Sequence, residues 1–165
     1  MNSSAILTVL PSLRRYARAM VGDRAAADDL VQDTLERAWS RVAQWQAGSD
    51  LRVWLFSIMH NLRVDQLRRP VLVTQPMADD SDAPIRATQT DRLELDDLDA
   101  ALARLPEEQR AVLLLVALEG RRYEEVAVTL GIPPGTVMSR LARGRERLRQ
   151  ILEGRPAPSH LRVVR

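Results

Sequence analysis

Hydrophobic residues recur every three to four positions through most of the chain, which is the spacing of an amphipathic helix. The first 70 residues predict three helices, over about 6–20, 25–42 and 51–69. The residues expected to point inward are Ile6, Leu7, Leu10, Leu13, Ala17, Met20, Leu30, Val31, Leu35, Ala38, Val42, Leu55, Ile58, Met59, Leu62 and Leu67. This first block is therefore expected to be a small helical bundle.

The helical spacing stops after the third helix and returns at Leu93. Residues 71–92 contain prolines and the acidic run DDSD, so they are expected to form a flexible acidic linker. Pro106 is placed to open a further helix, with Glu107 and Glu108 in the first turn, where the helix dipole favours negative charge. The rest of that helix is the segment VLLLVAL, which is apolar on nearly every side. Two interpretations stay open: a scaffold under the elements that follow, or a seat for a partner.

Residues 121–149 predict two helices joined by a tight turn. Gly131 is expected to end the first helix, because glycine accepts the left-handed conformation that closes a helix. Pro133 or Pro134 can open the second, where a missing backbone donor costs nothing. The pattern is that of a helix-turn-helix with a cationic second helix, and its arginines are Arg140, Arg143, Arg145, Arg147 and Arg149.

A solvated basic face is the simpler explanation of those arginines. The turn chemistry, together with a small Ala127 at the expected helix crossing and with Thr136 and Ser139 at the start of the second helix, favours DNA contact instead.

Charge is distributed unevenly along the 165 residues. The formal net charge of +2 divides into +3 over residues 1–70, −5 over 71–97 and +4 over 98–165. Two basic blocks around an acidic middle are typical of two nucleic-acid-facing domains on a tether. The chain has no cysteine, which excludes disulfides and thiolate metal sites. No apolar run is long enough to span a membrane, so a cytoplasmic protein is expected.

No enzymatic site is recognisable. His60 and His160 lie far apart in the sequence, and no phosphate-binding glycine loop or nucleophile motif is present. Asp28, Asp29 and Asp33 share a helix face and could hold Mg²⁺ only with oxygen ligands from elsewhere. We therefore expect no enzyme, no metal and no cofactor.

Trp39, Trp45 and Trp54 surround the segment AQWQAGSD, residues 43–50. Aromatic rings beside a basic helix suit stacking on unpaired bases, although aromatics at helical spacing more often belong to a core. We expect Trp54 to be structural and Trp45 to be exposed.

Several stretches resemble the extracytoplasmic-function (ECF, group IV) sigma factors of bacterial RNA polymerase. Region 4 of that family is similar to the segments LPEEQRAVLLLVALEG, YEEVA, LGIPPGTV and SRLARGRERLR. Regions 2.1 and 2.2 are similar to AADDLVQDTLERAW, and regions 2.3 and 2.4 are similar to VWLFSIMHNLRVDQLRR. The resemblance implies an all-α protein with a sigma region 2 bundle over 1–70, a linker over 71–92, a sigma region 4 helix-turn-helix over 93–153 and a frayed tail over 154–165.

The resemblance also implies partners. Core RNA polymerase would bind through its β′ clamp helices and β flap, and the clamp helices would dock on an acidic helix face that solubility alone would otherwise explain. That face consists of Asp28, Asp29, Gln32, Asp33 and Glu36. A cognate anti-sigma factor is a further implied partner, whereas a small-molecule substrate and direct membrane insertion are not. The acidic linker would pass through the nucleic-acid channel of the polymerase.

Promoter DNA would be contacted at two elements. The loop from Ala43 to Leu51 and the helix after it would capture a flipped base and hold phosphates at the minus-10 element. Flipping the base out of the stack costs a few kcal/mol, which the binding site must recover. The residues implied there are Trp45, Gln46, Ser49, Asp50, Arg52, Asn61, Arg63 and Arg68. The residues implied at the minus-35 element are Thr136, Ser139, Arg140, Arg143 and Arg145, with Arg140 and Arg143 at base edges or adjacent phosphates.

The chain departs from the family pattern at four positions. Arg121 and Arg122 replace an apolar residue and a serine, while Met138 and Ala142 occupy recognition-helix positions often held by larger polar residues. These departures bear on which promoter is selected. Two other functions stay open: a stand-alone DNA-binding regulator that acts as a dimer, and a sigma-like decoy that sequesters an anti-sigma factor.

Overall fold

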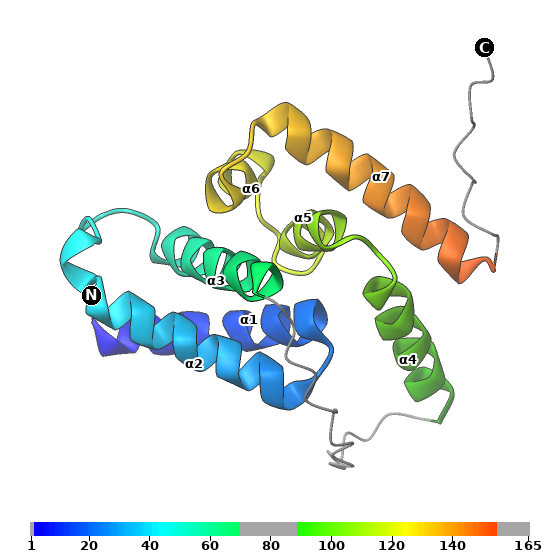
Figure 1. The fold of residues 1–165 in the computed structure, drawn as a ribbon, viewed down its shortest axis with the longest axis horizontal. Helices are drawn as coiled ribbons and strands as arrows, with labels where there is room; N and C mark the ends of the chain where they lie inside the picture. The colour runs from blue at the N-terminus through cyan, green and yellow to red at the C-terminus, as the bar shows by residue number, and fades with distance from the viewer. Residues whose placement is uncertain (1, 70–88, 155–165) are drawn as a thin grey trace.

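The computed structural model describes residues 2–69 and 89–154, for residues 89–94 by their backbone only, and every regular element in these ranges is a helix. The first domain contains α1 (Ser3–Val21), α2 (Arg24–Ser40), a short 3-10 helix (Val42–Gln44) and α3 (Leu51–Arg68). The second contains α4 (Gln89–Ala103), α5 (Glu107–Ala117), α6 (Tyr123–Leu130) and α7 (Pro134–Leu152) (Figure 1). The prediction of an all-α chain with two small helical domains is confirmed.

Local signals in the sequence set the helix ends. Gly22 adopts a left-handed conformation with φ of 79° and closes α1 by donating to the Arg18 carbonyl at 2.9 Å. The Asp23 carboxylate caps α2 by accepting from the backbone of Ala26 at 2.9 Å. The helix α4 begins at Gln89, four residues before Leu93, where the sequence pattern predicts that helical structure returns. The remainder of the expected linker, and the tail beyond Gly154, lie outside the described residues.

Three of the residues expected to point inward do not. Leu7 and Leu67 are 65% and 52% exposed, because each lies roughly a third of a turn around its helix from the buried side. Val42 is 38% exposed because α2 ends at Ser40 and Val42 belongs to the 3-10 helix that follows. Val9 and Tyr16 are buried in α1 instead, and the Tyr16 ring meets that of Phe56 edge to face at 5.2 Å.

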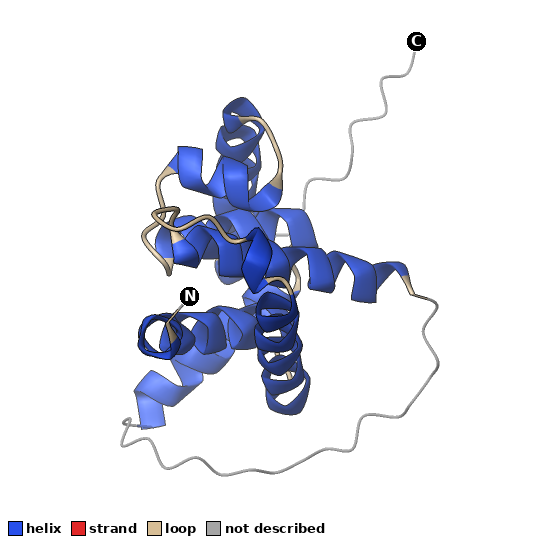
Figure 2. Cartoon of the chain, turned by 90° about the vertical axis from the view of Figure 1, so that its left-hand side faces the viewer, coloured by secondary structure: helices blue, strands red, loops and turns tan. Residues whose placement is uncertain are grey.

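The helix α5 lies on the side of the second domain that faces the first. It packs against α7 on one side and against α1 on the other, while α6 packs against α3 (Figures 1 and 2). Its residues from Ala111 to Leu115 are all buried, which explains the nearly uniform apolar sequence of this helix. The interpretation of VLLLVAL as a scaffold agrees with this packing, because one side of α5 supports the helix-turn-helix and the other packs against the first domain of the same chain. The buried apolar residues of the two domains form one continuous core.

Candidate protein-binding and nucleic-acid interfaces

The acidic residues of α2 form one exposed face. Their side chains all lie at the surface, on the side of the helix opposite to the buried Leu30, Val31 and Ala38; they are Asp28, Asp29, Gln32, Asp33 and Glu36. Within the face, the Gln32 amide donates to the Glu36 carboxylate at 3.1 Å. The arrangement gives a fixed negative surface suited to a basic partner.

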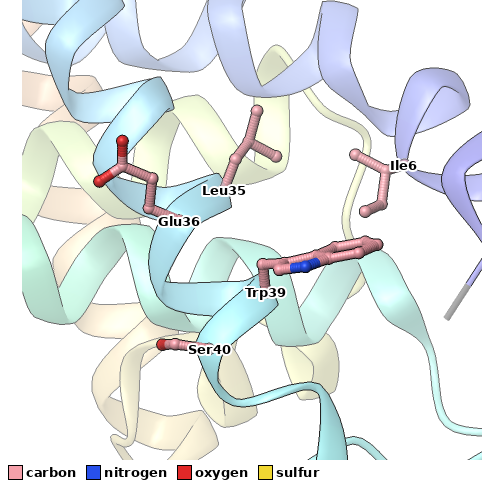
Figure 3. Close-up of a pocket in the computed structure, with 5 residues that line it drawn as sticks. All are labelled: Ile6, Leu35, Glu36, Trp39 and Ser40. Carbon is pink, nitrogen blue, oxygen red and sulfur yellow. The ribbon is translucent and has the colours of Figure 1, made fainter.

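An apolar groove continues this face toward the end of α2. It has a volume of about 510 Å³ and is lined by Ile6, Leu35, Glu36, Trp39 and Ser40 (Figure 3). The Trp39 ring lies across the groove between α1 and α2 and is 58% exposed. Sequence reasoning missed this groove, although the three-residue spacing from Glu36 to Trp39 places both on the same side of the helix.

The loop between α2 and α3 does not expose Trp45. The 3-10 turn, in which the Trp45 amide donates to the Val42 carbonyl at 3.1 Å, folds the ring back so that it is half-buried. Its indole nitrogen is buried without a hydrogen-bond partner. The exposed tryptophan is Trp39, so the expectation for Trp45 was wrong, whereas Trp54 packs against the core as expected.

Two other loop residues have structural roles. The Ser49 hydroxyl donates to the Gln46 carbonyl at 2.7 Å. The Asp50 carboxylate is the cap of α3, because its Oδ1 accepts from the backbone of Arg52 at 2.9 Å and of Val53 at 3.4 Å. Gln46 itself is exposed. Among the candidate minus-10 residues of this loop, Gln46 is therefore an exposed side chain without a structural role.

The candidate minus-10 residues of α3 lie on two sides of the helix. Arg52 and Arg63 are eleven residues apart, which is about three turns, and both are partly buried. Arg63 faces the second domain, where its guanidinium pairs with Glu107. Asn61 and Arg68 are about two turns apart and exposed on the opposite side. The structure thus brings only Asn61 and Arg68 together at the free surface of the helix.

The helix-turn-helix is formed by α6 and α7. Gly131 takes the left-handed conformation with φ of 65°, and Pro133 caps α7, which begins at Pro134. Val137 and Leu141 anchor α7 in the core. Farther along, Gly144 is pressed against α5, and a Cβ at this position would lie 3.4 Å from the backbone oxygen of Gln109.

The candidate minus-35 residues of α7 have different surroundings. Arg143 and Arg145 are exposed. Arg140 is only 25% exposed, and its guanidinium lies 3.6 Å from the Glu108 carboxylate on α5. Thr136 is half-buried, and the exposed Ser139 donates to the Thr136 carbonyl at 3.1 Å. The basic surface available on the first half of α7 is thus centred on Arg143.

Arg149, at the far end of α7, is held by carboxylates of its own helix. It donates to Glu146 at 2.6 and 3.1 Å and to Glu153 at 2.9 and 3.0 Å, and these bonds raise the pKa of the guanidinium further. The basic pattern of the sequence therefore overstates the free positive charge on this part of the helix.

The described residues contain no group of three or more histidine or carboxylate side chains close enough to hold a metal ion, so the magnesium alternative gains no support. Within the same ranges, no helix has the length and hydrophobicity needed to cross a membrane.

Two family descriptions match the chain, one for each domain. Residues 6–60 match "Sigma2 domain of PhyR", and residues 95–148 match "Sigma-70, region 4". Among solved structures, the chain is similar to the sigma factor RpoE in complex with the anti-sigma factor NepR from Bartonella quintana. The TM-score is 0.75 at 33% identity, over 91% of this chain and 95% of that one.

Characterised relatives agree with these matches. The chain is 40% identical over 154 residues to the ECF RNA polymerase sigma factor EcfG of Rhodopseudomonas palustris, which covers 89% of this chain and 82% of the relative. It is 36% identical over 152 residues to the ECF RNA polymerase sigma factor SigL of Mycobacterium tuberculosis, and this match covers 86% of this chain and 82% of SigL. The chain therefore belongs to the extracytoplasmic-function family of RNA polymerase sigma factors.

Proposed function

We propose that this protein is an alternative sigma factor, which binds core RNA polymerase and directs it to a set of promoters. The observation that carries the proposal is the presence, in one chain, of an exposed acidic face on α2 and an exposed basic stretch on α7, each in the domain where the family has its polymerase-binding and promoter-binding regions. Catalysis belongs to the polymerase, and the protein acts in the cytoplasm.

Polymerase docking is assigned to the acidic face of α2 together with the Trp39 groove. The basic β′ clamp helices would meet the carboxylates of the face, and a large apolar side chain of the same partner would fill the groove beside Glu36. The β flap would bind the second domain. An apolar anchor within a charged surface gives affinity where charge alone gives mainly orientation and association rate.

Promoter recognition is divided between the domains. Ser139 and Arg143 of α7 would face the major groove at the minus-35 element, with Thr136 and Arg140 on the same side of the helix and Arg145 toward the DNA backbone. Asn61 and Arg68 of α3, with Gln46 of the loop, would meet the melted minus-10 element first. Ser49 and Asp50 would lie beside Gln46 at the surface of the loop, whereas the partly buried Trp45, Arg52 and Arg63 would join only after a rearrangement.

Run-off transcription from a mixed promoter library, with bacterial core polymerase and with or without this protein, tests the proposal. New transcripts that share two upstream elements would establish a sigma factor and give its promoter. No new transcripts, together with tight binding of the free protein to duplex DNA, would favour the stand-alone regulator instead.

The docking face is tested with Asp33→Arg. Because like charges placed against each other across an interface cost several kcal/mol, core polymerase affinity should fall by at least about tenfold. The matched control is Asp65→Arg, the same charge reversal at an exposed position of α3 outside the face. Equal affinity of the Asp33→Arg variant and the wild type would place the docking face elsewhere.

Inhibition by an anti-sigma factor is proposed from a solved relative, since the sigma factor RpoE was solved in complex with the anti-sigma factor NepR. The match of the first domain to the Sigma2 domain of PhyR supports a second candidate function, a decoy, because PhyR of Bartonella quintana is an anti-anti-sigma factor. Binding of an anti-sigma factor without any transcription in the run-off assay would favour the decoy.

A further inference from the structure

The first half of α7 carries an exposed surface that is apolar at its centre. Gly135, Met138 and Ala142 all lie on the exposed side of this helix. Met138 is three residues from the first and four residues from the last, so the three positions are neighbours on the helix surface. The Met138 side chain is 53% exposed although it is apolar. We call these three residues the apolar patch of α7.

The fold leaves the apolar patch open. The helix α7 packs on α4, α5 and α6, and the buried Val137 and Leu141 turn its other side toward the core. A Cβ at Gly135 would have no packing neighbour within 4 Å. A single exposed apolar residue is common on protein surfaces and needs no explanation by itself. Met138 differs in its position, because it precedes Ser139 in the part of α7 that the proposed function places in the major groove.

The small residues of the patch allow a close approach to DNA. Gly135 has no side chain and Ala142 has only a methyl group, so the helix backbone on either side of Met138 can come near the base edges. Met138 is then the long side chain that fills the remaining space. Methionine suits such a position, because its unbranched and polarisable side chain adapts to irregular gaps.

The chemistry of Met138 selects among the four bases. Its side chain has no donor, and its thioether sulfur is only a weak acceptor. Placed against guanine or adenine it would cover polar groups of the base edge without pairing them, which costs free energy. Thymine presents a C5-methyl group in the major groove, and this group loses no hydrogen bond when it is buried.

The neighbouring Ser139 complements this preference. Its hydroxyl donates to the Thr136 carbonyl at 3.1 Å, so lone pairs of the oxygen remain available toward the solvent side. An acceptor in the major groove suits the amino group of adenine or cytosine. The exposed Arg143, one turn farther along, supplies the positive charge for guanine or a phosphate.

We propose that the apolar patch of α7 reads the C5-methyl group of thymine in the minus-35 element, with Met138 as the residue that determines this specificity. The inference deepens the proposed function and rests on it, because it names one base contact of the promoter-binding helix.

The test removes single methyl groups from DNA. The polymerase complex selects a duplex from a random library, and each thymine of the bound element is then replaced singly by deoxyuridine, which lacks only the methyl group. Affinity should fall about fourfold at the thymine that meets Met138, the effect of exposing one buried methyl group. In the Met138→Gln complex, the same replacement should change affinity by less than about 1.5-fold, because the carboxamide gains little from the methyl group.

The matched control is Leu152→Gln. Leu152 is 52% exposed, nearly as much as Met138, and lies at the other end of α7. This variant should keep the fourfold loss of the wild type, about the contribution of one methyl group. Both substitutions fall at exposed positions, so the core stays intact. A wild type that is insensitive to deoxyuridine at every thymine, or a Met138→Gln complex with the same loss as the wild type, would overturn the proposal.

The two proposals fail in different ways. Run-off transcription without any effect of deoxyuridine would refute methyl reading alone. If the complex selects no duplex, the selection is repeated with the free chain; a deoxyuridine effect that depends on Met138, without run-off transcription, would refute the sigma-factor proposal alone. Failure of both the complex and the free chain to select a duplex would refute both.

Discussion

Arg140 and Arg143 lie three residues apart on α7, yet they differ in what holds them. Arg140 is partly buried beside Glu108, whereas Arg143 is exposed. A guanidinium that is already paired loses an existing contact when it binds DNA, so the two arginines should not contribute equally.

We predict that Arg143→Ala lowers promoter affinity of the polymerase complex by about 1–3 kcal/mol, the value of a good base contact, and that Arg140→Ala lowers it less. Arg149→Ala is the control, because that arginine is held by two carboxylates. Binding to promoter and to mutated minus-35 duplexes at several salt concentrations separates the roles. A loss that is the same for both duplexes would make Arg143 a phosphate contact.

His60 lies half-buried on α3, and burial lowers the pKa of its imidazole, with Arg140 adding to the decrease and Glu107 opposing it. The folded chain therefore holds this residue neutral to lower pH than the unfolded chain does. As the pH falls below about 6.5, the unfolded state takes up the proton first, and the free energy of unfolding decreases.

We expect His60→Gln to remove part of this decrease while leaving the dependence near pH 8 unchanged. Urea unfolding of the wild type and the variant between about pH 5.5 and 8 measures it, in a range above the carboxylate pKa values. Parallel curves for the two proteins would show that His60 does not couple to folding.

At the scale of single elements, the turn between α6 and α7 depends on glycine at one position only. Gly131 has a positive φ of 65°, whereas Gly135 lies in the first turn of α7 with open space around it. Alanine at Gly131 should cost about 1–2 kcal/mol, because a side chain disfavours the left-handed conformation. Alanine at Gly135 should stabilise the helix by up to about 1 kcal/mol. Thermal melting compares the two variants, and equal melting temperatures would contradict this account.

The sequence predicts most elements because their signals are local. The capping residue Asp23, the terminal Gly22 and Gly131 and the prolines before α5 and α7 act within a few positions of themselves, and the structure uses all of them. The early start of α4 carries no such signal. Leu7 and Leu67 were misplaced because hydrophobicity alone does not state how wide the buried side of a helix is.

At the scale of the whole molecule, the contacts between the domains could not be predicted from the sequence. Arg15, Glu119 and Arg110 are separated by about 90 residues or more from their partners across the interface, and no pattern in the sequence pairs them. Charged residues on helices read as solvent-exposed, and only the packing of α5 against α1 reveals that Glu119 is fully buried. The candidate site was predictable for the exposed faces of α2 and α7 but not for Arg63, whose surroundings depend on that packing.

Arg110 of α5 connects the end of α1 to the end of α4. Besides the Met20 carbonyl, it donates to the carbonyls of Leu102, Ala103 and Leu105 at 2.8–3.0 Å, where α4 ends. We predict that Arg110→Ala lowers the free energy of unfolding by about 3 kcal/mol, since several charged hydrogen bonds are lost and buried carbonyls are left unpaired. Arg104→Ala, at an exposed position near the same helix end, should change it by less than about 0.5 kcal/mol. Urea denaturation decides, and a similar small change for both variants would remove Arg110 from this role.

The position of α5 between α1 and α7 also limits how this helix can evolve. A helix with one side in water accepts substitutions at every third or fourth position, as the exposed side of α7 allows. From Ala111 to Leu115 no such side exists, because one side of α5 packs against α7 and the other packs against α1 of the first domain. In a saturation mutagenesis scan, tolerance should therefore rise and fall with the helical repeat along α7 and stay uniformly low across this stretch of α5.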